Sequence, residues 1–364
     1  MKVAVILGTR PEIIKMSPII RELEKREIDF FILHTGQHYD YEMDGAFFDE
    51  LKLPKPKYNL GVGSGSQAEQ TGRILISVEG LLVKERPDVI LVQGDTNTVL
   101  AGALAGSKLG VKVGHVEAGL RSYDKSMSEE INRVITDHIS DYLFAPTTTA
   151  KQNLEREGIA ENKILVTGNT IVDAVNQNLE LSRKKSKVLK SFNLENGNFF
   201  LVTAHRAENV DSKTNFTGII NGLKAIRKEY NIPVILPLHP RSLKMVKEFN
   251  LDISGLMVIT PMNYLDFLSL ESNAKVILTD SGGVQEESCI LGVPCVTLRE
   301  KTERPETVEV GANRIVGTSV ERIIDGVRDA VSNQKKWLNP FGDGHAGELI
   351  ITYLRELMSR QKHN

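Results

Sequence analysis

Short runs of apolar and β-branched residues alternate along the chain with longer segments of helical periodicity. Six runs in the first half are predicted strands: residues 2–7, 29–34, 88–93, 111–116, 142–145 and 163–168. The segments 11–26, 68–86 and 98–110 repeat their apolar residues at helical spacing. Strands that are apolar on both faces and alternate with helices indicate a parallel sheet covered on both sides. The pattern therefore predicts a doubly wound α/β domain over residues 1–168.

The alternation lapses over residues 169–193, which are helical in pattern, polar and increasingly basic. We interpret this segment as the bridge between two domains, and its Lys/Arg cluster as a solvated helix face. A second series of strand-like runs follows at residues 198–206, 233–240, 256–261, 275–283, 294–300 and 313–318. The prediction is an α/β protein with two Rossmann-like, doubly wound domains facing a cleft. In such sheets ligands gather beyond the carboxyl ends of the strands.

Composition narrows the classes of function. The chain has 364 residues, of which 41% are hydrophobic and 25% charged, as is typical of a soluble globular protein. The formal net charge of −2 argues against nucleic acid as a partner, and no apolar run is long enough to enter a membrane as a span. Cys289 and Cys295 are too few for a disulfide framework or a zinc site. We expect a cytoplasmic protein.

Carboxylates gather at predicted strand ends. Asp95 follows the strand in "DVILVQGD", Glu117 follows the next in "VKVGHVE", and Glu129 and Glu130 begin the helix after it. Neighbouring parallel strands end at one rim, so these acids should lie close together. Crowded acids in a cleft raise the pKa of some members, which suits proton transfer near neutral pH. The alternatives are structural: Asp95 as a helix cap, a capping box of Ser126 with Glu129, and an i,i+4 ion pair of Glu129 with Arg133.

The stretch "TDSGGVQEES", residues 279–288, follows a predicted buried strand and opens a helix. Its glycines let the backbone approach a ligand, and free N–H groups at a helix N-terminus favour a phosphate. Ser281 can add a hydroxyl, and Glu286 or Glu287 can accept hydrogen bonds from ribose. The alternative is an ordinary strand–turn–helix with Asp280 or Ser281 as N-cap and glutamates that complement the helix dipole. Unaided, the residues indicate an enzyme that holds a phosphorylated ligand on its second domain and uses carboxylates of the first.

Six motifs in a fixed order carry a resemblance to a known family. They are "GTRPEIIKMSPI", "VQGDTNT", "HVEAGLRS…SEEINR", "TAHRAEN", "DSGGVQEES" and "TERPE". Together they resemble the non-hydrolysing UDP-N-acetylglucosamine 2-epimerases from Lys2 to the C-terminal helix. The resemblance implies the GT-B type of glycosyltransferase fold. It also implies that a helix of about residues 345–364 joins the first domain, and that residues 169–344 form the UDP-binding domain.

The resemblance further implies a homodimer that reversibly interconverts UDP-GlcNAc and UDP-ManNAc for surface-polysaccharide synthesis, without nicotinamide or metal. The route is elimination of UDP to give 2-acetamidoglucal, followed by re-addition, because the C2 proton has no adjacent carbonyl to acidify it. Two faces of C2 demand two proton-transfer groups. The implied catalytic residues are Asp95, Glu117, Glu129 and His205, with base and acid unassigned among the carboxylates. The residues implied to bind the UDP-sugar are Arg10, Lys15, Phe267, Ser281, Gly282, Gly283, Glu287 and Arg304.

Some positions depart from the family pattern. Met262 stands where relatives can carry glutamine. Bacterial members bind a second, activating UDP-GlcNAc through a Gln-x-x-Gln and an arginine. This chain has Gln37 followed by Asp40 in the first, and Ser66 at the expected position of the arginine. The candidates for such an allosteric site are therefore Gln37, Arg206 and His239. Within the acidic helix we expect Glu130 and Asn132 to be structural, and Arg133 to orient the acids.

Three other functions remain as alternatives. A hydrolysing 2-epimerase would release UDP and free ManNAc. A glycosyltransferase on the same fold would need an acceptor and would not exchange the C2 proton. A catalytically silent UDP-sugar sensor could keep Arg10, Ser281 and Glu287 but would have no use for the three carboxylates together.

Overall fold

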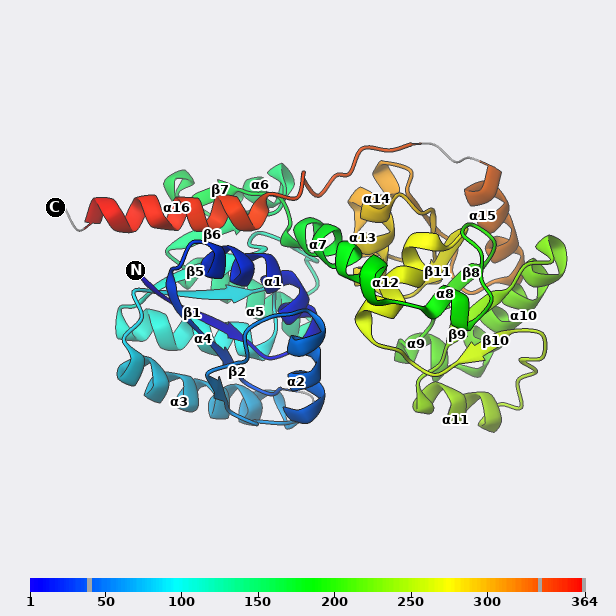
Figure 1. Ribbon diagram of the computed structural model, residues 1–364, viewed down its shortest axis with the longest axis horizontal. Helices are drawn as coiled ribbons and strands as arrows, with labels where there is room; N and C mark the ends of the chain where they lie inside the picture. The colour runs from blue at the N-terminus through cyan, green and yellow to red at the C-terminus, as the bar shows by residue number, and fades with distance from the viewer. Residues whose placement is uncertain (38–40, 333–335, 362–364) are drawn as a thin grey trace. The chain divides into compact units, whose positions relative to one another are not determined.

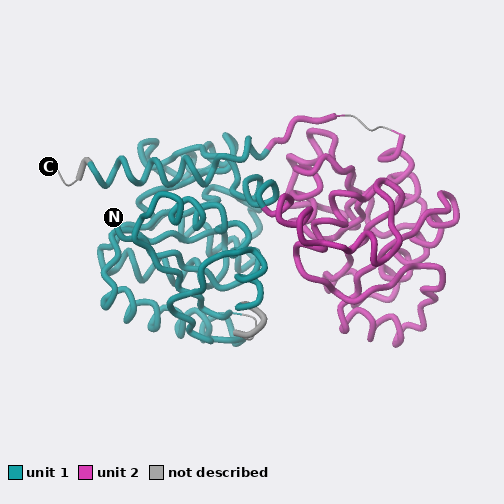
Figure 2. The backbone as a smooth tube through the Cα atoms, in the orientation of Figure 1, with its two compact units in different colours: residues 1–177, 341–364 teal, residues 178–340 magenta. Residues whose placement is uncertain are grey.

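Two parallel β-sheets organise the chain. The computed structural model describes residues 1–37, 41–332 and 336–361. These residues form two compact units, residues 1–177 with 341–364 and residues 178–340 (Figure 2). Each unit has one sheet with helices interleaved between its strands (Figure 1). The predicted pair of Rossmann-like sheets is therefore confirmed.

The sheet of the first unit has the order β3-β2-β1-β4-β5-β6-β7, in which the strands on either side of β1 run outward in sequence. Its strands are β1 (Lys2–Leu7), β2 (Asp29–His34), β3 (Tyr58–Asn59), β4 (Val89–Gln93), β5 (Lys112–Val116), β6 (Tyr142–Ala145) and β7 (Ile164–Val166). Its helical elements are α1 (Arg10–Lys25), α2 (Tyr41–Glu50), α3 (Gln67–Glu85), α4 (Asn97–Leu109), α5 (Ser128–Ile139), α6 (Thr148–Arg156), the 3-10 helix Glu161–Lys163 and α16 (Ala346–Gln361). Helix α7 (Thr170–Lys185) begins in this unit and ends in the other.

Burial on both faces explains why these strands read as unbroken apolar runs. Val89 to Val92 are all fully buried, as a parallel sheet covered by helices requires. Helix α4 approaches the sheet closely through Gly106, where an added Cβ would lie 2.3 Å from Cδ1 of Ile90. The small residues of "TNTVLAGALAG" therefore seat α4 on β4, next to α3 and α5.

The last helix belongs to the first unit. Helix α16 packs against α1 (Figure 1). Its inward face consists of Ile350, Ile351 and Leu354, which are fully buried. At its start, the backbone N–H of Gly347 donates to Oδ1 of Asp173 at 2.9 Å. Burial raises the pKa of Asp173 above its ordinary value.

The sheet of the second unit repeats the pattern with the order β10-β9-β8-β11-β12-β13. Its strands are β8 (Phe200–Thr203), β9 (Val234–Pro237), β10 (Met257–Ile259), β11 (Val276–Thr279), β12 (Cys295–Thr297) and β13 (Asn313–Ile315). Its helices are α8 (Val188–Ser191), α9 (Ala207–Val210), α10 (Lys213–Tyr230), α11 (Pro240–Glu248), α12 (Tyr264–Asn273), α13 (Gly282–Leu291), α14 (Pro305–Glu309) and α15 (Val320–Ser332). Its core includes Phe200, Phe216 and Leu278, all fully buried.

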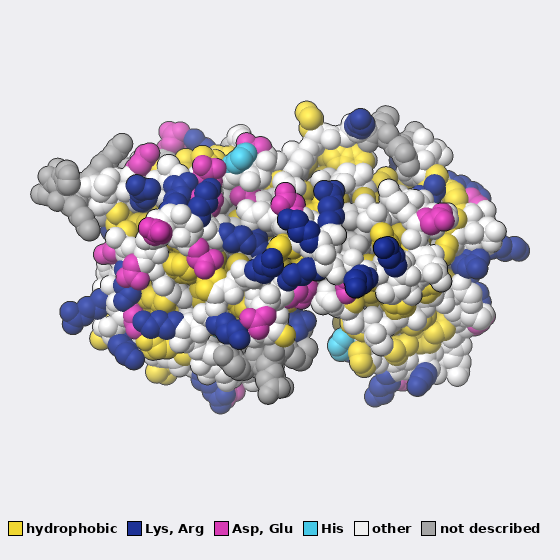
Figure 3. All heavy atoms as spheres, viewed as in Figure 1, with side chains coloured by type: hydrophobic (Ala, Val, Ile, Leu, Met, Phe, Trp, Pro, Cys, Tyr) yellow, Lys and Arg dark blue, Asp and Glu magenta, His cyan; other side chains and the backbone are white. Residues whose placement is uncertain are grey.

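The basic end of α7 is exposed, as predicted for residues 169–193. Arg183, Lys184 and Lys185 form its last turn and are exposed to solvent. In the view of Figure 3, Lys and Arg side chains gather over the path of this helix. Cations in the last turn interact favourably with the helix dipole. Within the described part of the chain, no helix combines the length and apolar character needed to cross a bilayer.

Candidate active site

Glu117 follows β5 and has an unusual backbone conformation. Its φ is 68°, in the left-handed region that non-glycine residues seldom adopt, and only 8% of the residue is exposed. Nζ of Lys15 donates to Oε1 and Oε2 of Glu117 at 2.7 and 2.9 Å. Side-chain amides of Gln93 and Asn169 also donate to this carboxylate, the latter at 3.2 Å. The fold thus fixes a buried carboxylate at the carboxyl end of a central strand.

The turn after Glu117 is held by close packing. Gly119 has a φ of +83°, and an added Cβ there would lie 2.3 Å from the carbonyl oxygen of Ala150. Its N–H donates to Oδ2 of Asp137 at 3.2 Å. Only glycine fits this approach without displacing the backbone. The glycine of "VEAGLR" therefore supports the strained residue two positions before it.

A fully buried polar cluster ties β5 to the end of β4. The ring nitrogens of His115 lie 2.6 Å from Oδ1 of Asp137 and 2.8 Å from the carbonyl oxygen of Gly94. Nη1 of Arg121 lies 2.8 Å from Oδ2 of Asp137. Burial alone would raise the pKa of Asp137, but His115 and Arg121 lower it below its ordinary value. This cluster positions the loop before Asp95. His115 and Arg121 stand in the motif "HVEAGLRS", and the closeness of His115 to Glu117 in the sequence was a usable signal, whereas Asp137 lies outside the six motifs.

Asp95 follows β4, and because β4 pairs with β5, it lies at the same sheet edge as Glu117. Its carboxylate is paired with the guanidinium of Arg133, and 35% of its side chain is exposed. Arg133 also pairs with Glu130. The predicted orienting contact between Arg133 and an acid is therefore present, at Asp95.

Glu130 has the structural surroundings expected of it. Its carboxylate accepts the backbone N–H groups of Ser122 and Tyr123 at 3.0 and 2.9 Å. Burial opposes ionisation, but these bonds and Arg133 lower the pKa of Glu130 below its ordinary value. Glu130 thus anchors the loop between β5 and α5.

Glu129 is exposed in the first turn of α5, where its carboxylate accepts the hydroxyl of Ser128 at 3.1 Å. The capping box considered for Ser126 and Glu129 does not form. Met127 occupies the N-cap position, and the hydroxyl of Ser126 instead donates to Asp124 at 2.6 Å. Glu129 is therefore the most accessible of the three predicted catalytic carboxylates.

Glu12 is a buried acid that is absent from the predicted site residues. Its carboxylate accepts the backbone N–H groups of Gly8 and Thr9 at 2.6 and 2.8 Å and the hydroxyl of Thr96 at 2.6 Å. Burial raises the pKa of Glu12 to about 7 despite these bonds. Thr9 and Glu12 form the capping box of α1, so the pattern Thr-x-x-Glu in "GTRPE" was the available signal.

Arg10 and Gln37, two further residues that were predicted to contact a ligand, lie near the start of α1. The guanidinium carbon of Arg10 lies 5.7 Å from the ring centre of Phe47. Gln37 is buried, and its Oε1 accepts the hydroxyl of Thr98 at 2.9 Å. Asp40 lies outside the described residues. The ligand contacts expected of Arg10 and Gln37 stay predictions.

In the second unit, Asp280 organises the turn that carries His205. Asp280 is fully buried after β11, and its Oδ2 accepts the N–H groups of His205 and Arg206, each at 3.0 Å. Nδ1 of His205 lies 3.2 Å from Oδ1 of Asp280, yet 58% of the His205 side chain is exposed. The imidazole is therefore both oriented and accessible.

The stretch 281–283 forms the N-terminus of α13. Ser281 is the N-cap residue, and its side chain makes no capping bond within the helix. A Cβ added at Gly282 would lie 3.7 Å from Oε2 of Glu303, and one at Gly283 would lie 3.9 Å from Oγ of Ser281, so neither would clash with its neighbours. Gly283 itself is exposed to solvent. This arrangement leaves room for an anion at the helix N-terminus.

The remaining predicted UDP contacts surround α13. Oε1 of Glu287 accepts the hydroxyl of Tyr264 at 2.8 Å, and Nε of Arg304 lies 2.7 Å from Oε1 of Glu286. Phe267 and Met262 pack partly buried against one hydrophobic cluster. His239 is the exposed N-cap residue of α11, outside this group.

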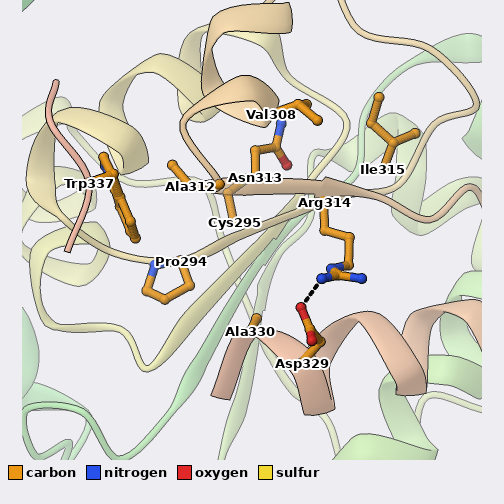
Figure 4. A pocket seen from close by; sticks show the side chains of 11 residues that line it. Pro294, Cys295, Val308, Ala312, Asn313, Arg314, Ile315, Asp329, Ala330 and Trp337 are labelled. Atoms are coloured by element: carbon orange, nitrogen blue, oxygen red, sulfur yellow. Dashed lines mark ion pairs between the residues drawn. The ribbon is translucent and has the colours of Figure 1, made fainter. Parts of the chain in front are cut away.

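A cavity of about 450 Å³ opens beside β12 and β13 (Figure 4). Trp337 and Pro294 line one side, and the ion pair of Arg314 with Asp329 lies on another. None of the predicted site residues contributes to its lining. Among the residues that the structure describes, no group of three or more His, Cys, Asp or Glu side chains is arranged to hold a metal ion.

Known proteins with similar sequences belong to one enzyme family. The model of the UDP-N-acetylglucosamine 2-epimerase family matches residues 21–355. A UDP-N-acetylglucosamine 2-epimerase of Methanocaldococcus jannaschii is 58% identical over 361 residues, covering 97% of this chain and 99% of that protein. One from Methanococcus maripaludis is 54% identical over 357 residues, covering 96% of this chain and 97% of that protein.

A solved structure extends the likeness to three dimensions. It is the M. jannaschii UDP-GlcNAc 2-epimerase in complex with UDP-GlcNAc and UDP, with a TM-score of 0.88. The two chains are 58% identical, and the match covers 98% of this chain and 100% of the other. Together with the two parallel sheets, this likeness confirms the predicted GT-B type of fold. The chain belongs to the UDP-N-acetylglucosamine 2-epimerase family.

Proposed function

We propose that this protein is a non-hydrolysing UDP-N-acetylglucosamine 2-epimerase that interconverts UDP-GlcNAc and UDP-ManNAc. Membership of the family supports the activity. The structural observation that carries the proposal is Glu117, a buried carboxylate on a left-handed backbone, bonded to Lys15. Such strained residues persist only when their surroundings hold them, and they cluster at active sites. The product UDP-ManNAc would serve surface-polysaccharide synthesis.

The chemistry requires removal of a proton that is not acidic. In the proposed route a carboxylate takes the C2 proton while the C1–O bond to UDP breaks. The electrons of the C–H bond form the C1=C2 double bond of 2-acetamidoglucal, and the electrons of the C–O bond leave with UDP. A second acid then returns a proton to the opposite face of C2 while UDP adds again at C1. No electron is gained or lost overall, so the residues need supply only proton transfer and charge stabilisation.

Three carboxylates of the first unit are proposed to move these protons. Asp95 and Glu117 follow neighbouring strands, and Glu129 begins α5. Glu117 is held by donors, whereas Asp95 and Glu129 retain more exposure to solvent. A reaction that moves two protons needs one group to accept and another to donate, and different surroundings give carboxylates the different pKa values that these roles require.

The second unit is proposed to bind the UDP part of the substrate. The backbone N–H groups of Ser281, Gly282 and Gly283 at the N-terminus of α13 suit the diphosphate, and His205 would stabilise its charge as it leaves. The further proposed contacts are Glu287 to the ribose, Phe267 to the uracil, and Arg10, Lys15 and Arg304 to the nucleotide. Lys15 already bonds Glu117, so its charge would also hold that carboxylate in place.

The decisive test is proton NMR of UDP-GlcNAc incubated with the enzyme in D₂O. The proposal requires deuterium at C2, the appearance of UDP-ManNAc, and UDP still attached at equilibrium. Complete release of UDP with free ManNAc would instead identify a hydrolysing enzyme. A retained C2 proton would remove the epimerase mechanism and leave a transferase or a sensor as the candidates.

We also propose that the protein is a homodimer, as the family resemblance implies. Helix α3 exposes Ile76 and Val83, which are 75% and 55% accessible, and α5 exposes Ile131 and Ile135. Helix α4 packs against both α3 and α5, so these residues belong to one helical layer of the first unit. Exposed aliphatic side chains grouped on one layer favour a buried interface over contact with water. A second copy of the chain is the proposed partner.

A further inference from the structure

The second unit buries a glutamate that the proposed chemistry does not use. Glu271 lies in α12 and is fully inaccessible to solvent. An ionised carboxylate can only accept hydrogen bonds. Among the described residues, no donor reaches either carboxyl oxygen of Glu271. A buried charge without a donor is strongly unfavourable, whereas a neutral carboxylic acid can itself donate. The burial therefore favours a protonated Glu271.

The carboxylate of Glu287 can accept a hydrogen bond from the protonated Glu271. Burial, followed by the negative charge of Glu287 on α13, raises the pKa of Glu271 well above its ordinary value. Tyr264 on α12 and Cys295 on β12 also face Glu271, and neither is a cation. In a pair of carboxyl groups, the protonated member can donate a hydrogen bond to the ionised one.

Glu287 is already oriented from a second direction. The Tyr264 hydroxyl donates to its Oε1 at 2.8 Å, and only 7% of the residue is exposed. A bond from a protonated Glu271 would add a second fixed donor to the same carboxylate.

We propose that Glu271 is a positioning residue, whose carboxylic acid donates a hydrogen bond to Glu287 and holds that carboxylate ready to receive the ribose hydroxyls of a uridine nucleotide. The inference rests on the proposed function, in which Glu287 contacts the ribose. The proton stays on Glu271 throughout, and no bond to substrate is made or broken there. Glu271 therefore acts on binding through Glu287.

Two substitutions of Glu271 distinguish the loss of its hydrogen-bond donor from a change in side-chain packing. Glu271→Met keeps the length of the side chain but removes the donor, and Glu271→Gln keeps a donor without needing a proton. We expect Glu271→Met to weaken UDP binding about tenfold, because a hydrogen bond to a charged group is lost, and Glu271→Gln to stay within about threefold of the original chain. Titration calorimetry with UDP gives both values. With 2′,3′-dideoxy-UDP, which has no ribose hydroxyls, the Met variant should bind as the original chain does.

The matched control is Glu248→Gln on the exposed face of α11, which should leave UDP binding unchanged. Thermal unfolding of each variant reports whether it is folded. We expect the Met variant to fold but to be less stable than the original chain, because the nearly buried carboxylate of Glu287 loses a hydrogen-bond donor. Three results would overturn the inference: unchanged UDP affinity in the Met variant, equal losses for Met and Gln, or equal losses for UDP and the dideoxy compound.

The outcomes also distinguish this inference from the proposed function. An original chain that binds UDP and exchanges the C2 proton, together with an unaffected Met variant, would refute only the role of Glu271. An original chain that binds UDP in the expected pattern but exchanges no proton would refute the epimerase. Failure of the original chain to bind UDP would refute both.

Discussion

Glu117 combines three properties that are costly separately: a left-handed backbone, nearly complete burial and a carboxylate charge. The turn through Gly119 and the cluster of His115 with Asp137 fix its backbone, and Lys15 compensates its charge. A side chain fixed in this way loses little conformational freedom when a reaction begins. Preorganisation of this kind is a large component of enzyme catalysis.

Removing any one of the three carboxylates should block proton transfer while leaving the nucleotide site intact. We expect Asp95→Asn, Glu117→Gln and Glu129→Gln each to slow C2 exchange by about 10²- to 10⁴-fold, the usual contribution of a positioned acid or base. UDP affinity should remain within a few-fold. Rates come from NMR in D₂O and affinities from calorimetry. Glu69→Gln, at an exposed position of α3, is the control. Normal exchange in all three variants would eliminate the carboxylate mechanism.

Glu12 should make stability depend on pH. Its folded pKa of about 7 lies above the ordinary value of 4.5, so the folded protein binds this proton more tightly than the unfolded chain. The stability it contributes is complete below pH 4.5 and is lost as pH rises to about 7, at up to about 1.4 kcal/mol per pH unit. Urea unfolding of Glu12→Gln between pH 5 and 7 should show a shallower fall than the original chain. The exposed Glu24→Gln on the same helix should show no such difference.

The sequence could predict the position of a residue where neighbouring residues in the chain determine it. Glu117 could be placed at a strand end because the apolar run before it is contiguous. Its partners Gln93, Asn169 and Lys15 are 24, 52 and 102 residues away along the chain. Contacts over such separations arise only when the strands and helices pack, so no local pattern reveals them.

At the level of elements, the two sheets follow directly from hydrophobic periodicity. The predicted strand 2–7 coincides with β1, and the predicted helix 11–26 lies one residue from α1. Strand β3, residues 58–59, was not predicted because two residues cannot display a period. Helix α5 begins at Ser128 with Met127 as its N-cap, because Ser126 bonds Asp124 instead of capping the helix. Whether Ser126 bonds within the turn or caps the helix depends on backbone geometry, which cannot be predicted from the spacing of residues.

Helix α16 should stabilise the first unit through its buried face. Ile351 is fully buried in this helix, whereas Leu349, two positions earlier, is 45% exposed. Ile351→Ala should lower the free energy of unfolding by about 2–5 kcal/mol, because it removes buried methyl groups and leaves a cavity. Leu349→Ala should cost clearly less. Chemical unfolding of both variants measures the difference, and equal losses would contradict the packing described for α16.

At the scale of the whole molecule, the fold divides the proposed work between two units. The acids belong to the first unit, and the N-terminus of α13 that is proposed to bind the diphosphate belongs to the second. Each set could be predicted from strand ends, because parallel sheets expose their carboxyl ends as ligand sites. Composition contributed less, since a net charge of −2 and two buried cysteines exclude classes of function without naming one.

The exposed layer of the first unit gives a test of assembly. If Ile76 lies in the proposed interface of the homodimer, Ile76→Glu would bury a charge against the partner and should shift the protein from dimer to monomer. Light scattering coupled to size-exclusion chromatography measures the mass of each form. Glu79→Gln on the same helix face is the control and should remain dimeric. A dimer that persists in Ile76→Glu would place the interface elsewhere.

The position of α16 also sets an order of events during synthesis. The ribosome delivers β1 to β7 before any part of the second unit, yet it delivers α16 only after all of that unit has been made. Until then, α1 lacks the helix that packs on it, and the nascent first unit keeps an apolar surface in contact with water or chaperones. The half of the protein that is translated first is therefore completed last.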